Sequence, residues 1–331
     1  MQKIRLYEVT ARDGLQNEKT IVSLNHKIDL ICALINAGYK DIEVGSFVKP
    51  SWIPQLADSD QLIANLPPAP EGVRYWSLIP NMRGLERALD CGVQHIATFM
   101  SASETHNRKN VNRTQKESLS SLKHVIETAK EEDMTVRSYI STVFGCPYEG
   151  ELKLSPTSIP SETLRKIDLS VQIALEHLSF GADCIALGDT TGMANPKLIQ
   201  IVILKMQEAN IPLNKIALHL HDTRGTALAN ALAGYQSGIR TFDGSTAGLG
   251  GCPYAPGATG NAASEDLLNM FNTMGVDTEV DFAKACSAGL MLRNILSKPL
   301  PGRYHNYHYA QHSAQAHSKE DATPTKMASN S

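Results

Sequence analysis

The stretch from His219 to Asn261 reads HLHDTRGTALANALAGYQSGIRTFDGSTAGLGGCPYAPGATGN. It follows an apolar run, continues through apolar residues at helical spacing, reaches a second apolar run and ends in a loop with five glycines. This order predicts a strand, a crossover helix, a second strand and a long loop, which is the unit of parallel α/β folds. The fold of the chain therefore depends on how often this unit recurs.

The same unit recurs along most of the chain. Short apolar runs predict eight strands, at residues 4–9, 40–44, 74–79, 93–100, 136–143, 184–187, 216–219 and 239–244. Helically spaced apolar residues separate these runs, and further helices are predicted from Ser264 and over residues 282–296. Eight strands alternating with helices over about 275 residues predict a closed (β/α)8 TIM barrel rather than an open sheet. The helices after the eighth strand are additions to that barrel.

Residues at the predicted helix starts support this interpretation. Thr114 and Glu117 have the spacing of a capping box. Asn195 precedes a proline, which is a favourable residue in the first turn of a helix. Ser264 is predicted to be the N-cap of the helix that follows the glycine-rich loop.

The barrel and its C-terminal helices are predicted to form one domain over residues 1–298. From Pro299 the composition changes to Pro, Ser, His, Asn and Lys with few aliphatic residues, so residues 299–331 are predicted to be a disordered tail. Four histidines of this segment could bind metal adventitiously, and the favoured interpretation is a solvated tail. They are His305, His308, His312 and His317.

Composition excludes several classes of protein. The chain has 331 residues, 42% hydrophobic and 20% charged, and a net charge of −3, so neither nucleic acid nor an anionic membrane is expected as a main partner. No apolar run approaches the roughly 18 to 20 residues that span a bilayer. The N-terminus runs directly into a strand pattern, and the six cysteines form no CxxC pair, so a cytoplasmic protein is expected.

Polar residues capable of chemistry gather at the ends of the predicted strands. In a barrel, the carboxyl ends of all strands meet at one mouth, where active sites form. We therefore expect these side chains to lie close together, although they are far apart in sequence. They are Arg12 and Asp13 after the first strand, Glu43 in the second, Asp189 after the sixth, His219 and His221 at the seventh, and Cys252 and Asn261 after the eighth.

The two histidines are predicted metal ligands. Residues i and i+2 of a strand face the same side, so His219 and His221 can reach one ion. With the carboxylate of Asp13 and the amide oxygen of Asn261, the ligand set favours Mg²⁺ or Mn²⁺ over structural Zn²⁺. The alternative is a pair of buried histidines that bond to backbone carbonyls.

The charged residues nearby have catalytic interpretations. Arg12 provides a fixed cation that can stabilise an enolate, or it forms only a surface ion pair with Asp13. Glu43 lies at the end of a buried strand, where a carboxylate must be paired or functional. Asp189 is expected to support Arg12 or a ligating histidine.

Cys252 lies in the glycine-rich loop, within the second of two GCPY segments. A thiol on a mobile loop above a substrate can donate or accept a proton. The alternative is a structural turn with an incidental cysteine, and this is the interpretation we give to Cys146 in the first GCPY segment. Cys32, Cys184 and Cys286 lie in apolar patterns and are expected to be small core residues.

Six segments together closely resemble hydroxymethylglutaryl-CoA lyases. In chain order they are VTARDGLQNEK, EVGSFVKPSWIPQLAD, GCPYEG, LGDTTGMANP, HLHDTRGTALAN and GLGGCPYAPGATGN. The similarity covers roughly residues 4–295. Related condensing barrels, such as isopropylmalate synthases, share the histidine pair but generally lack the cysteine loop.

The resemblance implies a metal-dependent lyase that cleaves 3-hydroxy-3-methylglutaryl-CoA to acetyl-CoA and acetoacetate, usually as a homodimer or larger oligomer, in leucine degradation or ketone-body formation. Its metal ligands would be Asp13, His219, His221 and Asn261. Its catalytic residues would be Arg12, Glu43, Asp189, His219 and Cys252. Its acyl-CoA would be bound by Arg12, Gln16, Ser46, Arg108 and Lys109.

One residue and one segment depart from the family pattern. Because of them, the identity of the C3 substituent of the substrate stays open. Ala186 stands where relatives often have serine, and the segment SETHNRKNVNRT is more polar than its usual counterpart. In this segment, Arg108 and Lys109 either meet CoA phosphates or are solvated. The alternatives are a lyase for a related substrate, such as citramalyl-CoA or a branched glutaryl-CoA, or a condensing synthase.

Overall fold

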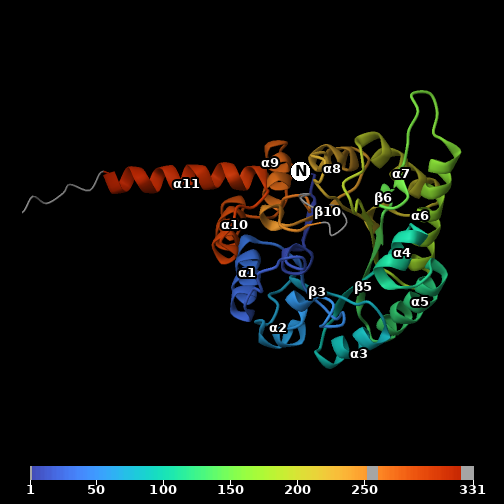
Figure 1. Cartoon of the computed structure of the whole chain (residues 1–331), viewed down its shortest axis with the longest axis horizontal. Helices are drawn as coiled ribbons and strands as arrows, with labels where there is room; N and C mark the ends of the chain where they lie inside the picture. The colour runs from blue at the N-terminus through green and yellow to red at the C-terminus, as the bar shows by residue number, and fades with distance from the viewer. Residues whose placement is uncertain (1, 252–259, 322–331) are drawn as a thin grey trace, which may run out of the picture.

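A computed structural model describes residues 2–251 and 260–321 of the chain. Eight parallel strands form a closed barrel in the order β1-β10-β9-β8-β5-β4-β3-β2, as the sequence predicts (Figure 1). They are β1 (Arg5–Glu8), β2 (Asp41–Ser46), β3 (Arg74–Leu78), β4 (His95–Ser101), β5 (Thr135–Ser141), β8 (Cys184–Gly188), β9 (Ile216–His219) and β10 (Thr241–Gly244). A short antiparallel pair, β6 (Gly145–Cys146) and β7 (Gly150–Glu151), lies outside the barrel sheet.

Helices surround the barrel, and Figure 1 shows them following the strands in chain order. They are α1 (Leu24–Ala37), α2 (Ser59–Asn65), α3 (Met82–Asp90), α4 (Glu104–Val111), α5 (Gln115–Glu131), α6 (Ser161–Ser179), α7 (Pro196–Glu208), α8 (Ala227–Gln236), α9 (Ser264–Thr273), α10 (Phe282–Leu296) and α11 (Arg303–Asp321). Within the described ranges, no helix is both long and apolar enough to cross a bilayer.

The predicted helix starts are confirmed with one exception. Thr114 and Glu117 form a complete capping box at α5, and Asn195 accepts from the Leu198 N–H at the start of α7. The prediction for Ser264 is wrong, because Ala263 is the N-cap of α9. The Ser264 hydroxyl instead donates to Glu8 Oε2 at 2.5 Å, so it joins α9 to the end of β1.

Strands β1 and β10 close the barrel, so the two ends of the sequence meet. Their register pairs Arg5 with Thr241 and Glu8 with Gly244. Directly after β1, residues Thr10–Gly14 form one turn of π-helix in which every residue is buried. The sequence predicts only a polar turn here. The observed turn aims two successive charged side chains, Arg12 and Asp13, at the mouth of the barrel.

The interior of the barrel combines very small and very large side chains. Alanines of β4, β8 and β9 form a buried cluster with Tyr139 and Leu78: they are Ala97, Ala186 and Ala217. Such small residues leave room for bulky ones, and Arg137 and Tyr7 are among the largest fully buried side chains. Ala186 therefore lies in this interior packing.

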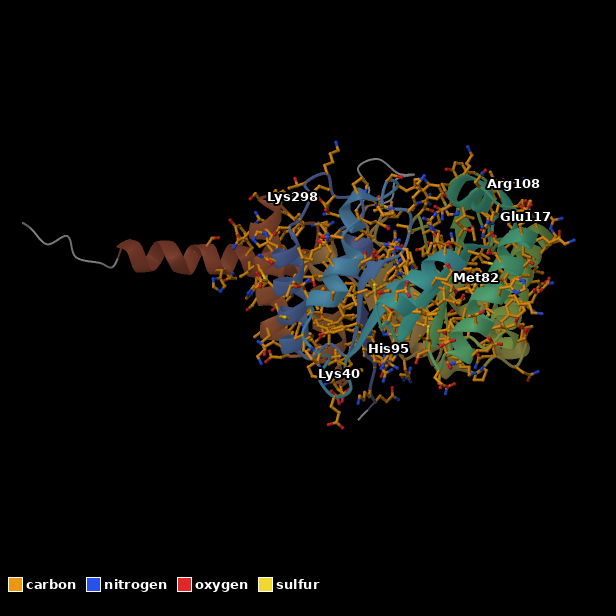
Figure 2. The ribbon with its side chains drawn as sticks, turned by 90° about the horizontal axis from the view of Figure 1, so that it is seen from below. Lys40, Met82, His95, Arg108, Glu117 and Lys298 are labelled. Atoms are coloured by element: carbon orange, nitrogen blue, oxygen red, sulfur yellow. The ribbon has the colours of Figure 1, made fainter. Side chains whose placement is uncertain are left out.

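Helix α11 corrects the prediction of a disordered tail from residue 299. Its start is fixed on the barrel: Asp266 accepts from the N–H groups of Arg303 at 3.0 Å and Tyr304 at 2.6 Å. Gly302 N–H donates to Ala247 O at 2.7 Å, and His305 is buried. Further along, the helix projects away from the barrel (Figure 2). The predicted disorder of residues 322–331 lies outside the described residues.

Candidate active site at the barrel mouth

Those polar residues predicted from the strand ends that the structure describes converge at one end of the barrel. Figure 2 places Arg108 at this end and His95, at the start of β4, toward the opposite end. A cavity of about 190 Å³ opens here. It is lined by residues that follow most of the barrel strands, among them Arg12, Asp13, Gln16, Tyr139, Thr190, His219 and His221. The predicted convergence is therefore observed for the residues that follow the first strand, Arg12 and Asp13, and for the two histidines of the seventh, His219 and His221.

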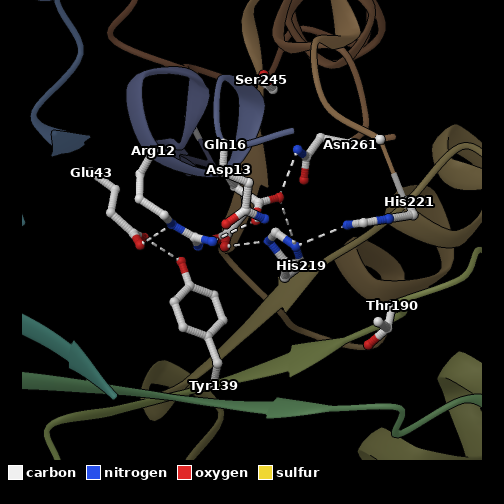
Figure 3. Close-up of polar contacts among 12 residues, drawn as sticks. Arg12, Asp13, Gln16, Glu43, Tyr139, Thr190, His219, His221, Ser245 and Asn261 are labelled. Atoms are coloured by element: carbon white, nitrogen blue, oxygen red, sulfur yellow. Dashed lines mark hydrogen bonds and ion pairs between the residues drawn. The ribbon is translucent and has the colours of Figure 1, made fainter. Parts of the chain in front are cut away.

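Three side chains form a compact group of metal-binding type. One ligand atom from each of Asp13, His219 and His221 lies within 4.8 Å of the others. The two histidine Nε2 atoms are 3.1 Å apart, and His219 Nε2 is 3.9 Å from Asp13 Oδ2 (Figure 3). The imidazoles therefore point at each other and not at backbone carbonyls, which disfavours the alternative of two structural histidines.

Asn261 completes this group, as the closure of the barrel predicts. Its Nδ2 donates to Asp13 Oδ2 at 2.9 Å and to Leu249 O at 3.2 Å. Its buried Oδ1 has no hydrogen-bond partner within the described part of the chain. Gly250 permits this arrangement, since its φ is +134° and a Cβ there would lie 2.6 Å from Asn261 Nδ2.

Arg12 links two carboxylates. Its Nη1 donates to Asp13 Oδ1 and its Nε donates to Glu43 Oε1, each at 2.5 Å. Glu43 is fully buried, and its second oxygen accepts from the Tyr139 hydroxyl at 2.7 Å. Of the two predicted alternatives for Glu43, paired or functional, the structure shows that it is paired, and Arg12 belongs to a buried network rather than to a surface ion pair.

Electrostatics keep Arg12 and Asp13 charged. Burial opposes the charge of Arg12, but Asp13 and Glu43 outweigh it and raise the pKa of the guanidinium. Burial likewise opposes the charge of Asp13, but Arg12, His219 and His221 lower the pKa of its carboxyl. For His221, burial and then His219 lower the pKa to about 4, so its imidazole is neutral near pH 7 and able to act as a ligand.

The donor set and the charge balance both fit a divalent cation. One carboxylate, two imidazoles and one amide oxygen without a partner suit Mg²⁺ or Mn²⁺. Counted as ionised, the charged groups linked to Arg12 and His219 by hydrogen bonds sum to one net negative charge: Arg12, Arg137, Asp13, Glu43 and Asp243. A divalent cation reverses this sign, and an anionic substrate then restores neutrality.

The Asp189 side chain does not make the expected contact with Arg12 or a ligating histidine. Its Oδ1 accepts hydrogen bonds from the backbone N–H groups of Met193 and Ala194. Its contact with His219 is a backbone hydrogen bond, from the Asp189 N–H to the His219 carbonyl oxygen. Burial raises the pKa of its carboxyl to about 7. Asp189 therefore shapes the loop after β8, and neither Arg12 nor an imidazole is its side-chain partner.

Asp243 has the supporting role that we expected of Asp189. It lies in β10, and its Oδ2 is 3.0 Å from His219 Nδ1. Sequence reasoning missed both Asp243 and its partner Arg137 in β5. A usable signal was present, because a charge inside the runs VRSYIS and TFDG must be paired if those strands are buried.

Of the predicted acyl-CoA contacts, Arg12 and Gln16 line the cavity, whereas Ser46, Arg108 and Lys109 are not among its lining residues. Gln16 lines the cavity and donates to Asp13 Oδ1 at 2.7 Å. Ser46 is buried, and its hydroxyl lies 3.4 Å from Leu78 O. Arg108 is exposed and pairs with Glu104, whereas Lys109 lies over the Tyr148 ring, 4.8 Å from its centroid. Cys252 lies outside the described residues.

The other cysteines follow their predictions in part. Cys146 is buried, and its Sγ lies 3.0 Å from Ser103 Oγ, in keeping with a structural turn. Cys286 is buried in α10 as expected for a core residue. Cys32 and Cys184 are only partly buried. All of these are free thiols.

Comparison with known proteins gives a consistent result. A family model described as HMGL-like matches residues 3–291. Hydroxymethylglutaryl-CoA lyase YngG of Bacillus subtilis is 46% identical over 302 residues, which is 91% of this chain and 96% of that protein. A 3-hydroxy-3-isohexenylglutaryl-CoA/hydroxy-methylglutaryl-CoA lyase of Pseudomonas aeruginosa is 42% identical over 90% of this chain and 94% of its own length.

A solved structure agrees with these relatives. The crystal structure of a Bacillus subtilis HMG-CoA lyase superposes with a TM-score of 0.85 at 45% identity. The match covers 93% of this chain and 98% of the other.

Proposed function

Since the chain belongs to the HMGL-like family, we propose that it is a carbon–carbon lyase that cleaves 3-hydroxy-3-methylglutaryl-CoA to acetyl-CoA and acetoacetate. The observation that carries this proposal is the contact between Arg12, a cation suited to an enolate, and Asp13, one of the clustered metal-binding groups. Neither of the two named relatives described above is a condensing synthase.

The proposed ligands are Asp13, His219, His221 and Asn261. When bound, a divalent cation would polarise the oxygens of the substrate and lower the pKa of its tertiary hydroxyl. The choice of Mg²⁺ or Mn²⁺ rests on the oxygen and imidazole donors. The remaining chemistry belongs to the side chains around the cavity.

We propose the following roles for those side chains. A base takes the hydroxyl proton, with Glu43 and Asp189 as the candidates. The C2–C3 bond then breaks: C3 becomes the ketone of acetoacetate, and the bonding electrons form an enolate on the thioester. Arg12 stabilises the enolate oxygen, and such a preorganised donor is worth roughly 3 kcal/mol of barrier. Cys252 protonates the enolate carbon, which yields acetyl-CoA; His219, the other candidate from the sequence, would hold the cation through Nε2 while its Nδ1 faces Asp243.

We propose Asp189 rather than Glu43 as the base, a choice that the sequence leaves open. Both oxygens of Glu43 already accept hydrogen bonds, from Arg12 and Tyr139. Glu43 therefore acts through Arg12, whose guanidinium it holds in place. Asp189 Oδ2 has no hydrogen-bond partner in the described ranges, so Asp189 is the stronger candidate for the base.

Finer parts of the proposal come from the sequence and from the family resemblance. We propose a homodimer or larger homo-oligomer, located in the cytoplasm and acting in leucine degradation. Gln16, Ser46, Arg108 and Lys109 are the proposed acyl-CoA contacts, and the position of Gln16 in the cavity supports its role most directly.

The test is a substrate panel assayed for acetyl-CoA release by the purified protein. We expect cleavage of 3-hydroxy-3-methylglutaryl-CoA with acetoacetate as the second product, and slower cleavage of citramalyl-CoA. Cys252→Ser should cut the rate strongly, whereas Cys146→Ser, the matched change in the other GCPY segment, should not. Efficient cleavage of another acyl-CoA only, or condensation without cleavage, contradicts the proposal.

A further inference from the structure

Asp243 and Arg137 form a buried ion pair that the proposed reaction does not use directly. Both side chains are 2% exposed, and Arg137 Nη2 donates to Asp243 Oδ1. The guanidinium also stacks on Tyr7, with its Cζ 3.9 Å from the ring centroid, and lies 5.0 Å from the centroid of Tyr139. An ion pair fixed on several sides in this way holds the carboxylate of Asp243 in one orientation.

The second oxygen of Asp243 is directed at a proposed metal ligand. Asp243 Oδ2 lies 3.0 Å from His219 Nδ1. Register explains this contact, because Phe242 of β10 pairs with Leu218 of β9, and the next residues in each strand are Asp243 and His219. The two side chains therefore come from adjacent positions of neighbouring strands.

This contact determines which nitrogen of His219 carries the proton. An ionised carboxylate only accepts hydrogen bonds, so Nδ1 must be the donor. In a neutral imidazole, Nε2 then keeps its lone pair. That nitrogen is the one 3.1 Å from His221 Nε2 and 3.9 Å from Asp13 Oδ2, so the lone pair is directed into the group of ligands.

We propose that Asp243, held by Arg137, is a positioning residue that fixes His219 in the Nδ1–H tautomer and thereby prepares Nε2 to bind the cation. The proposal rests on the metal site proposed above. Hydrogen-bond partners of this kind typically contribute about 10- to 100-fold to metal affinity.

Asp243→Asn tests the proposal with little change of shape. The carboxamide oxygen will face the Arg137 donor, so its NH₂ group will face His219 Nδ1. Nδ1 must then accept, and the proton moves to Nε2, where it blocks the ligand position. We expect the Mn²⁺ dissociation constant, measured without substrate by electron paramagnetic resonance of free Mn²⁺, to rise about 10- to 100-fold.

Asp41→Asn is the matched control. Asp41 is a buried carboxylate in β2 that accepts from Arg74 Nε at 2.7 Å and Trp76 Nε1 at 2.8 Å, with no contact to the metal-binding group. Both variants should lower the melting temperature, but only Asp243→Asn should weaken Mn²⁺ binding. A dissociation constant within twofold of wild type for Asp243→Asn overturns the proposal.

Two further measurements separate this proposal from the metal site on which it rests. If wild type does not bind Mn²⁺, or if Asp13→Asn binds it as tightly, the metal site itself is wrong. If Asp243→Asn does not fold, ¹⁵N spectra of histidine-labelled, metal-free wild type decide the matter. His219 should appear as the Nδ1–H tautomer, and an Nε2–H tautomer contradicts the positioning role.

Discussion

Arg12 is the residue on which the proposed chemistry depends most. Its guanidinium contacts Asp13 and Glu43 at the same time, through two different nitrogens. A lysine has a single ammonium group on a flexible stem and cannot reproduce this geometry. The side chain that we propose to stabilise the enolate is thus held from both sides before the substrate arrives.

Arg12→Lys should therefore lower kcat by roughly 10²–10³, the usual cost of losing one preorganised oxyanion donor. Steady-state kinetics with 3-hydroxy-3-methylglutaryl-CoA provide the measurement. KM should change much less, because the contact strengthens mainly in the transition state. A kcat within threefold of wild type argues against the role of Arg12.

Glu265 gives a prediction about pH and stability. It is fully buried, its Oε2 accepts from Ala247 N–H, and burial raises the pKa of its carboxyl from 4.5 to about 8. Between these values the unfolded chain releases the proton and the folded chain keeps it. The free energy of unfolding must therefore fall as pH rises from about 4.5 to about 8, by up to a few kcal/mol.

Glu265→Gln removes this titration. Urea unfolding at pH 5.5 and pH 8.5 should show a smaller pH dependence in the variant than in wild type, so that the variant gains relative stability at the higher pH. The same pH dependence in both proteins means that Glu265 is ionised in the folded state. Glu8, whose pKa burial raises to about 7, contributes in the same direction in both proteins.

At the residue scale, the sequence identifies the side chains that follow strands more reliably than those inside them. Asp13, His219, His221 and Asn261 all reach one site, as strand-end positions predict. Their partner Asp243 sits within a strand, where its direction depends on the register with β9. Neither strand by itself specifies that register, so it becomes visible only in the paired strands.

At the scale of elements, α10 shows how closely the C-terminal helices pack. Gly289 lies in this helix, and a Cβ there would lie 2.5 Å from Glu265 Oε1 and 2.9 Å from His305 Nδ1. Those atoms belong to α9 and α11. The glycine therefore allows three helices to meet around a buried carboxyl and a buried imidazole.

Gly289→Ala should destabilise the protein, although alanine is normally the better helix former by about 1 kcal/mol. Overpacking of a tight contact costs typically 1–3 kcal/mol, so we expect a lower melting temperature. Ser287→Ala, at an exposed position of the same helix, is the control and should be neutral or stabilising. An equal or higher melting temperature for Gly289→Ala contradicts this account of the packing.

The elements that sequence reasoning missed are those stabilised by distant contacts. All eight strands were predictable from local apolar patterns. The start of α11 was not, because it is held by Asp266 and Ala247, which lie far away in sequence. The π-helical turn at Thr10–Gly14 was also missed, because its polar residues are typical of an exposed turn.

At the scale of the whole molecule, barrel closure assembles the proposed metal site. Asp13 follows the first strand and Asn261 follows the last strand of the barrel. Even so, Asn261 Nδ2 lies 2.9 Å from Asp13 Oδ2. A ligand that binds only the folded state stabilises it by about 2.7 kcal/mol at 100 times its dissociation constant. Metal binding should therefore stabilise the fold as well as enable catalysis.

Mn²⁺ at about 100 times its dissociation constant should raise the melting temperature of chelator-treated protein by several degrees. Differential scanning calorimetry provides the measurement, and Asp13→Asn should lose most of the shift. Identical melting curves with and without Mn²⁺ would show that these side chains do not hold a cation.

The central claim is that this site cleaves 3-hydroxy-3-methylglutaryl-CoA with the help of a divalent cation. The most direct measurement is single-turnover cleavage by wild type treated with EDTA, before and after Mg²⁺ or Mn²⁺ is restored. Cleavage should stop in the chelator and return with the cation. An undiminished rate in EDTA, or no cleavage with either cation, would contradict it.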